Sequence, residues 1–193
     1  MPAQTRTPRD SWIDAGLRAL AAGGPDAVRV ETLAQELGVT KGGFYWHFAD
    51  RNGLLAEMLD RWEHVMVDAV IEQVEAKGGD AATRLRRLFG LGASVDDLLN
   101  IELAVRDWAR RDQDVGERVL RVDNRRMDYL RGLFGDLYDD PADVEMRCFV
   151  VMTLFVGGQL IAADHGGRTR SAVVKDALRW LDSSPPATRK RRS

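Results

Sequence analysis

The residues best suited to bind another molecule are concentrated in one short segment, Gly38 to Arg51, with the sequence GVTKGGFYWHFADR. It combines a lysine, two adjacent glycines, a histidine and a run of aromatic side chains. Each glycine weakens a helix by about 1 kcal/mol relative to alanine, so a pair of them indicates a need for uncovered backbone. Backbone N–H groups at a helix start attract anions, and lysine, tyrosine and histidine can donate hydrogen bonds to phosphate oxygens. The segment therefore predicts a surface for a phosphate-bearing partner.

Two short helices joined by a tight turn are expected to position this segment. A helix over about residues 30–37 ends at Gly38, which can adopt the left-handed conformation that closes a helix. Thr40 then caps the next helix, and Phe44 and Phe48, four residues apart, point inward. This arrangement has a scaffold helix, a glycine turn and a second helix whose polar and aromatic residues point outward. It predicts a helix-turn-helix that binds DNA.

The stretch VRVETLAQELGVTKGGFYWHFADRNGLLAEML resembles the DNA-binding region of the TetR family of bacterial transcriptional regulators. The likeness covers about residues 9–60, from SWIDAGLRALAAGG through LGVT and FYWHF to ADRNGLL. It implies a three-helix DNA-binding domain continuous with a fourth helix, then a larger helical domain that dimerises and binds an effector. The residues that the resemblance assigns to double-stranded DNA are Thr40, Lys41, Gly42, Gly43, Tyr45, Trp46, His47 and Arg51.

Two features of this region leave alternatives open. Arg29 stands where the family often has a threonine or serine cap. Either the start of that helix frays, or Arg29 reaches a phosphate itself, and we include it among the predicted DNA-binding residues. Of Tyr45, Trp46 and His47, one is expected to be partly buried against the first helix, and Trp46 is the residue we select.

The composition of the chain limits how it can bind DNA and where it works. Its 193 residues carry 28 basic and 30 acidic side chains, so DNA binding must depend on local placement of charge. Cys148 is the only cysteine, which excludes an intrachain disulfide and suits a reducing compartment. The sequence shows no secretory start and no apolar run long enough to span a bilayer. These features predict a cytoplasmic protein with no membrane partner.

The apolar residues recur with the helical period, and no stretch alternates long enough to predict a strand. The chain is therefore expected to be all-α, with about nine helices. They span about residues 8–22, 30–37, 40–48, 50–77, 81–93, 97–110, 115–137, 141–164 and 169–181, and Thr7, Asp50 and Asp140 are expected to cap three of them. We predict a helix-turn-helix domain over residues 1–50, a regulatory and dimerisation domain over 51–183, and a disordered basic tail over 184–193.

The C-terminal two thirds is expected to dimerise and to hold a small-molecule effector. By the same resemblance, the last two long helices meet those of a second copy. A homodimer places two recognition helices roughly 34 Å apart, which suits a palindromic operator. The apolar residues that we predict to line an effector cavity, each of which taken alone fits an ordinary core position, are Trp62, Met66, Phe89, Leu103, Trp108, Met127, Phe149 and Met152.

The sequence contains no signature of catalysis or of a metal centre. His64 and Asp68 lie one turn apart on a helix, but a metal site needs three or four ligands. We therefore expect neither an enzyme nor a cofactor. The leading hypothesis is a repressor that an effector releases from its operator. The alternatives are an activator with the same helix-turn-helix, a ligand-binding or enzymatic helical protein with a vestigial helix-turn-helix, and an adaptor that docks a protein through the aromatic helix.

Overall fold

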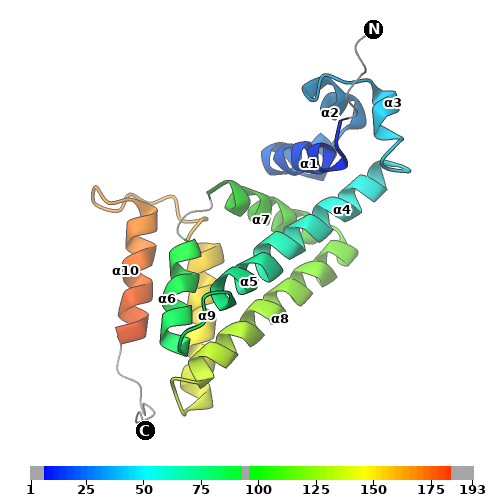
Figure 1. Cartoon of the computed structure of the whole chain (residues 1–193). Helices are drawn as coiled ribbons and strands as arrows, with labels where there is room; N and C mark the ends of the chain where they lie inside the picture. Colours follow the sequence, from blue (N-terminus) through cyan, green and yellow to red (C-terminus); the bar gives the residue numbers. More distant parts are fainter. Residues whose placement is uncertain (1–6, 93–95, 184–193) are drawn as a thin grey trace. The chain divides into compact units, whose positions relative to one another are not determined.

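The computed structural model describes residues 7–92 and 96–183, and in those ranges it contains helices and no β-strand. If α4, a π-helical turn at His64–Asp68 and α5 are counted as one helix, the described ranges hold nine, which confirms the all-α prediction (Figure 1). A 3-10 turn also spans Pro25–Ala27. The helices are α1 Arg9–Gly23, α2 Val30–Glu36, α3 Lys41–Phe44, α4 Arg51–Glu63, α5 Ala69–Glu75, α6 Ala81–Gly92, α7 Asp96–Ala109, α8 Gln113–Gly135, α9 Pro141–Gly157 and α10 Arg170–Ser183.

Two of the four predicted helix caps, those at Asp50 and Asp140, are present. Asp50 accepts a hydrogen bond from the backbone N–H three residues later, at 2.8 Å, and Asp140 accepts one from the N–H two residues later, at 3.0 Å. The prediction for Thr7 is wrong, because α1 begins at Arg9 with Pro8 in the cap position and no side-chain cap bond. Thr40 occupies the cap position of α3, but its hydroxyl makes no cap bond.

The long helix predicted over residues 50–77 is interrupted by the π-helical turn His64–Asp68. A π turn holds more residues than an α turn, so it rotates the buried face of the helix. Trp62 is buried before the π turn, Met66 and Val67 are buried within it, and Val74 is buried after it. The sequence-based prediction assumed one continuous α-helix and therefore did not include this change in the direction of the buried face.

The helix predicted over residues 141–164 ends at Gly157 instead. Gly157 and Gly158 adjoin each other there, and the chain continues in turns, in which the N–H of Leu160 donates to the carbonyl of Gly157 at 3.0 Å. Two consecutive glycines are poor helix formers, which accounts for the early end.

By their contacts, the residues fall into two compact units. The first unit comprises the chain up to Met66 together with Asn100–Leu120, and the second comprises Val67–Leu99 with Arg121 onward. The predicted boundary near residue 50 separates the residues expected to bind DNA from the regulatory domain, which is a functional division rather than a division by contacts. That boundary stays a prediction. The predicted tail, residues 184–193, lies outside the described residues.

In the first unit, aromatic and close helix contacts hold α1 against α3 and α4. The Trp12 ring meets Phe44 edge-on with centroids 5.4 Å apart, and Phe44 stacks on Phe48 at 5.1 Å. A Cβ added to Gly16 on α1 would lie 2.6 Å from the Met58 sulfur on α4. The absence of a side chain at this glycine therefore lets the two helices pack closely.

In the second unit, α6, α8, α9 and α10 share one apolar core. It contains Ala81, Leu85, Leu130, Leu133, Phe134, Tyr138, Val144, Cys148, Val151, Leu178 and Leu181. The buried guanidinium of Arg147 on α9 pairs with Asp143 at 3.1 Å, donates to the carbonyl of Leu181 on α10, and lies 4.0 Å from the centre of the Tyr138 ring. Arg147 thus ties α9 to the end of α10.

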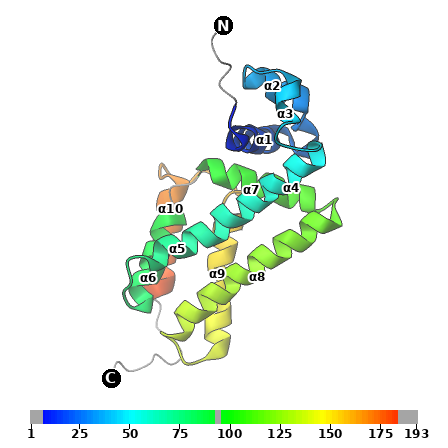
Figure 2. The same cartoon turned by 45° about the vertical axis from the view of Figure 1, so that its right-hand side comes forward.

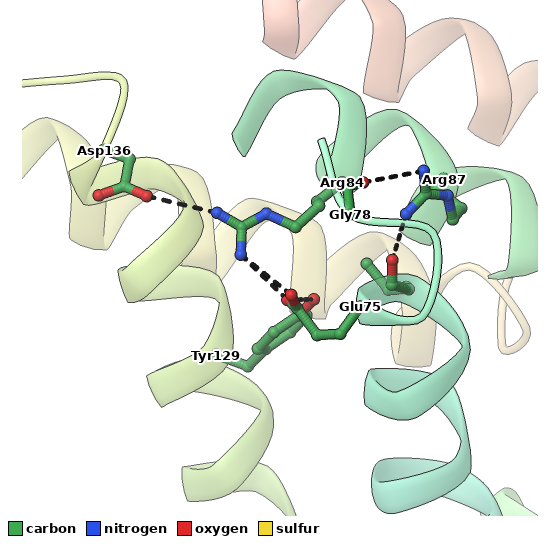
Figure 3. Close-up of polar contacts among 7 residues, drawn as sticks. Glu75, Gly78, Arg84, Arg87, Tyr129 and Asp136 are labelled. Carbon is green, nitrogen blue, oxygen red and sulfur yellow. Dashed lines mark hydrogen bonds and ion pairs between the residues drawn. The ribbon is translucent and has the colours of Figure 1, made fainter. Parts of the chain in front are cut away.

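A polar network fixes the C-terminal end of α5 in the second unit (Figure 3). Glu75 accepts hydrogen bonds from the Tyr129 hydroxyl on α8, at 2.7 Å, and from Arg84 on α6, at 3.1 Å. The bond from Tyr129 is the largest of the interactions that lower the pKa of Glu75. Arg87 donates hydrogen bonds to the carbonyls of Val74 and Gly78, at and just after the end of α5. Carbonyls at a helix end lack partners within the helix, and Arg87 supplies them. In Figure 2 the ribbons of α5 and α8 run roughly parallel to each other.

Candidate nucleic-acid interface

The turn between α2 and α3 has the geometry of a glycine-closed helix end. Gly38 has a φ of 67°, in the left-handed region where glycine has no steric penalty. The N–H of Gly38 donates to the carbonyl of Gln35 at 3.1 Å, and the N–H of Val39 donates to that of Ala34 at 2.9 Å. The predicted role of Gly38 is confirmed, and the turn sets the direction in which α3 leaves α2.

The predicted inward positions of α3 and the turn that follows it are also confirmed. Phe44 and Phe48 are both buried, and the N–H of Phe48 donates to the carbonyl of Phe44 at 3.1 Å. The α-helix itself ends at Phe44, so Tyr45, Trp46 and His47 lie in a tight turn rather than in a continued helix.

Trp46 is the most exposed of the three residues in this turn, which contradicts our expectation that it would be the most buried. Its exposed fraction is 73%, and that of Tyr45 is 55%. Trp46 lies in the turn between the buried Phe44 and Phe48, and its exposure shows that its side chain points away from the core. His47 is the half-buried residue, and its Nε2 lies 2.9 Å from the carbonyl oxygen of Thr7.

Neither Gly42 nor Gly43 is required by the internal packing of the domain. Both lie in or next to the first turn of α3 with ordinary helical backbone, and neither has a positive φ. A Cβ at Gly42 would meet the Thr40 hydroxyl at 3.7 Å, and one at Gly43 would meet the Trp12 ring at 4.0 Å, both ordinary contact distances. The glycines therefore leave the start of α3 bare without serving the fold.

The charged residues around this bare helix start make contacts with the protein itself. Lys41 forms an exposed ion pair with Glu31 on α2, and the hydrogen bond between them raises the pKa of Lys41 and lowers that of Glu31. Arg29 donates through Nε to the carbonyl of Asp26 at 3.1 Å. Its own carbonyl accepts from the N–H of Leu33 at 2.9 Å, so the first turn of α2 is formed without a hydroxyl cap.

Arg51 has a structural role that the sequence did not predict. Its Nε donates to the carbonyl of Val28 at 2.7 Å, and a terminal nitrogen donates to the carbonyl of Pro25. These bonds join the start of α4 to the turn that precedes α2. No sequence signal marks such a role, because the partners are backbone carbonyls. Its DNA contact stays a prediction.

The eight predicted effector-binding residues divide equally between the two units. Trp62, Met66, Leu103 and Trp108 belong to the first unit, and Phe89, Met127, Phe149 and Met152 belong to the second. Seven of them are buried or half-buried. Phe149 is wrong as a cavity residue, because 68% of it is exposed on the face of α9 opposite the buried Val144, Cys148 and Val151. Sequence reasoning also missed Glu102, a buried carboxylate that bonds to Trp62.

Across residues 7–92 and 96–183, no group of three histidine, cysteine or acidic side chains could hold a metal ion. In the same ranges no helix is both long and apolar enough to cross a membrane.

Part of the amino-acid sequence matches known regulatory proteins. Residues 13–58 match the family described as "Bacterial regulatory proteins, tetR family". The HTH-type transcriptional regulator AcrR of Shigella flexneri is 29% identical over 80 residues, which is 42% of this chain and 37% of that protein. The match thus spans little more than a third of the relative's own length.

The similarity of the fold extends over nearly the whole chain. A transcriptional regulator from Saccharomonospora viridis, crystallised with choline, superposes with a TM-score of 0.76 at 18% identity, over 95% of this chain and 98% of that one. A transcriptional regulator from Rhodococcus sp. Rha1 gives 0.72 at 18% identity, over 91% and 94%. FadR from Bacillus subtilis, in complex with stearoyl-CoA, gives 0.67 at 16% identity, over 92% and 100%.

Proposed function

We propose that this chain, which belongs to the TetR family of bacterial regulatory proteins, controls transcription as a homodimer on a palindromic DNA operator. A small molecule bound by the rest of the chain releases the dimer, so the regulator is a repressor. It works in the cytoplasm, without enzymatic activity or a cofactor. The single observation that carries the proposal is the exposure of Tyr45 and Trp46 beside the bare start of α3.

This surface suits a DNA backbone and the edges of bases. The first turn of a helix offers backbone N–H groups and a partial positive charge, and glycine lets a phosphate or a base come close to them. Lys41 adds a cation, and the hydroxyl of Tyr45 adds a donor. Thr40, Gly42, Gly43 and Trp46 complete the contact surface. Arg29, His47 and Arg51 flank it, and their bonds to backbone carbonyls hold this surface in shape.

Dimerisation has a candidate surface on α9. Met146, Phe149 and Thr153 are exposed and follow the helical spacing i, i+3 and i+7, so they share one outward face. Trp180 on α10 is also largely exposed. Large exposed apolar side chains on neighbouring helices mark an interaction surface, and we assign it to a second copy of the chain.

The effector is a small molecule. Two proteins of the same fold were crystallised with choline and with stearoyl-CoA, and these ligands differ widely in size and charge. We propose that the present chain binds its own effector within its helical C-terminal part. An effector can release DNA only through a higher affinity for the state that does not bind the operator.

Selection of duplexes from a random DNA pool tests the DNA-binding function. We expect an inverted-repeat sequence to be enriched and its affinity to fall steeply between about 50 and 200 mM salt, since each phosphate contact releases counterions. An adaptor that docks a protein through the aromatic turn predicts no enriched duplex. Recovery of no sequence, or salt-independent binding, would refute the proposal.

The oligomeric state of Phe149→Glu tests the dimer surface. A buried carboxylate at each of two symmetric positions costs several kcal/mol, so we expect a folded monomer by sedimentation. Leu120→Glu is the matched control, because Leu120 is a similarly exposed apolar residue on α8. Equal dimer content in the wild type and Phe149→Glu would exclude this face.

A further inference from the structure

Glu102 on α7 is a buried acid with no role in the functions proposed above. Among the described residues, the buried charged side chains are Glu102 and Arg147, which are 1% and 2% exposed. Arg147 ties α9 to α10 in the core of the second unit. Glu102 belongs to the first unit, which also contains the helix-turn-helix.

The Glu102 carboxylate joins α7 to α4 through both of its oxygens. Oε2 accepts a hydrogen bond from the indole N–H of Trp62 at 2.9 Å, and Trp62 is itself buried on α4. Oε1 accepts from Nε and a terminal nitrogen of Arg106, at 2.8 and 2.7 Å. Arg106 therefore balances the buried negative charge, while the indole bond crosses to α4.

Stability alone is a weak reason to keep such a group in a core. Replacing a buried ion pair with apolar residues is often neutral or stabilising, because both charges must lose their hydration. A hydrogen bond instead adds direction, which apolar contacts lack. The Trp62–Glu102 bond fixes both the rotation of α4 about its axis and its position along α7.

The position of α4 determines that of α1, and through α1 that of α3. On α4, Glu57 pairs with Arg9 of α1, and Arg61 pairs with Asp10 of α1. Close packing between α1 and α4 leaves little freedom for sliding, as the glycine contact with Met58 shows. On its other side, α1 supports α3 through the contact between Trp12 and Phe44.

We propose that Glu102 is a positioning residue for DNA binding, which holds α4 in the orientation that the helix-turn-helix needs. Its effect on the operator rests on the proposed function, whereas its effect on α4 does not. Loss of the Trp62–Glu102 bond lets α4 sample other orientations, so a smaller fraction of the protein is competent to bind DNA.

The test uses three full-length variants: Trp62→Phe, Glu102→Leu, and the double variant that carries both substitutions. Each is compared with a control variant, Val105→Ala. Phenylalanine keeps most of the buried ring and removes the indole donor, and leucine keeps much of the volume of glutamate without its oxygens. Val105 is buried on the same helix as Glu102, so its truncation controls for a general loss of stability. Urea unfolding first establishes conditions in which every variant is folded.

Amide hydrogen exchange measures the effect on α4 without DNA. We expect Glu102→Leu to speed exchange in α4 by about tenfold relative to α9, and Val105→Ala to speed α4 no more than α9. On the operator selected for the wild type, both single variants and the double variant should bind about five- to tenfold more weakly, because all three lack the same bond. Val105→Ala should stay within about twofold of wild type.

Equal rates of amide exchange in α4 for Glu102→Leu and Val105→Ala would overturn the inference. It would also be overturned if the loss of operator affinity in the double variant equalled the sum of the losses in the two single variants. Failure of the wild type to bind any selected duplex refutes the proposed function separately. In that case the exchange measurement alone decides whether Glu102 positions α4.

Discussion

Replacing Gly42 and Gly43 by alanine should stabilise the protein and weaken its binding to DNA. The backbone of both residues is compatible with alanine. The nearest atoms to the added Cβ groups lie at 3.7 and 4.0 Å, so the fold accepts both methyls without rearrangement. Alanine also loses less conformational entropy than glycine when the helix forms.

The size of the stabilisation follows from helix propensity. Each substitution should add roughly 0.5–1 kcal/mol to the free energy of unfolding, toward the lower value because α3 is short. Two methyl groups between the helix start and a phosphate would separate donor from acceptor beyond hydrogen-bond distance. Loss of about 1.4 kcal/mol in binding corresponds to tenfold weaker affinity, and we expect at least this loss for the double variant.

Urea unfolding and operator titration of the same samples provide the assay. Gly16→Ala and Gly38→Ala are matched controls, since the first would place a Cβ 2.6 Å from the Met58 sulfur and the second would force alanine to a φ of 67°. Both controls should destabilise the fold, by about 1 kcal/mol or more. Unchanged operator affinity in a stabilised Gly42→Ala, Gly43→Ala variant would refute the close-approach reasoning.

Three further predictions follow from contacts in the structure. Glu31→Gln should tighten operator binding about threefold, because it removes both an acid near the phosphates and a competitor for Lys41. The exposed ion pair with Lys41 contributes little to stability, so the variant should stay folded. Arg147→Met should lower the free energy of unfolding by about 3 kcal/mol, because it strands Asp143 and a buried carbonyl. Burial raises the pKa of the Cys148 thiol to about 11, so its contribution to stability should be present below its unfolded pKa and be lost as pH rises toward 11. Comparison of urea unfolding in the wild type and Cys148→Ala across this pH range measures that loss.

Each of these three predictions has a control variant or an outcome that would contradict it. Weaker operator binding by Glu31→Gln would show that Glu31 orients Lys41 rather than competing for it. Arg168→Met, which removes an exposed ion pair with Asp176, should change stability by less than about 1 kcal/mol, and an equal loss from Arg147→Met would contradict the role assigned to burial. Rapid labelling of Cys148 by a thiol reagent in the folded protein near pH 8 would contradict its burial.

Local rules in the sequence predicted the features of the fold that depend on near neighbours. The caps at Asp50 and Asp140 and the left-handed Gly38 are confirmed because each depends on residues within a few positions. The inward Phe44 and Phe48 are confirmed because helical spacing determines which face they share.

The features that the sequence did not reveal depend on distant partners or on small changes of register. Arg51 bonds to backbone carbonyls, which no side-chain pattern records. The π turn at His64–Asp68 shifts the buried stripe, and hydrophobic periodicity does not distinguish one extra residue from a wider apolar face. Glutamate is a residue type that usually lies on the surface, so nothing in the sequence indicated that Glu102 is buried. Its partner Trp62 lies 40 positions earlier in the chain.

Operator binding by a Lys41→Ala, Tyr45→Ala double variant tests the DNA-binding surface most directly. Both side chains are exposed, so the variant should keep the helical content and urea midpoint of the wild type. We predict that its affinity for the selected palindromic duplex falls by about 100-fold, with a shallower salt dependence. A folded double variant that binds this duplex as tightly as the wild type would contradict the account.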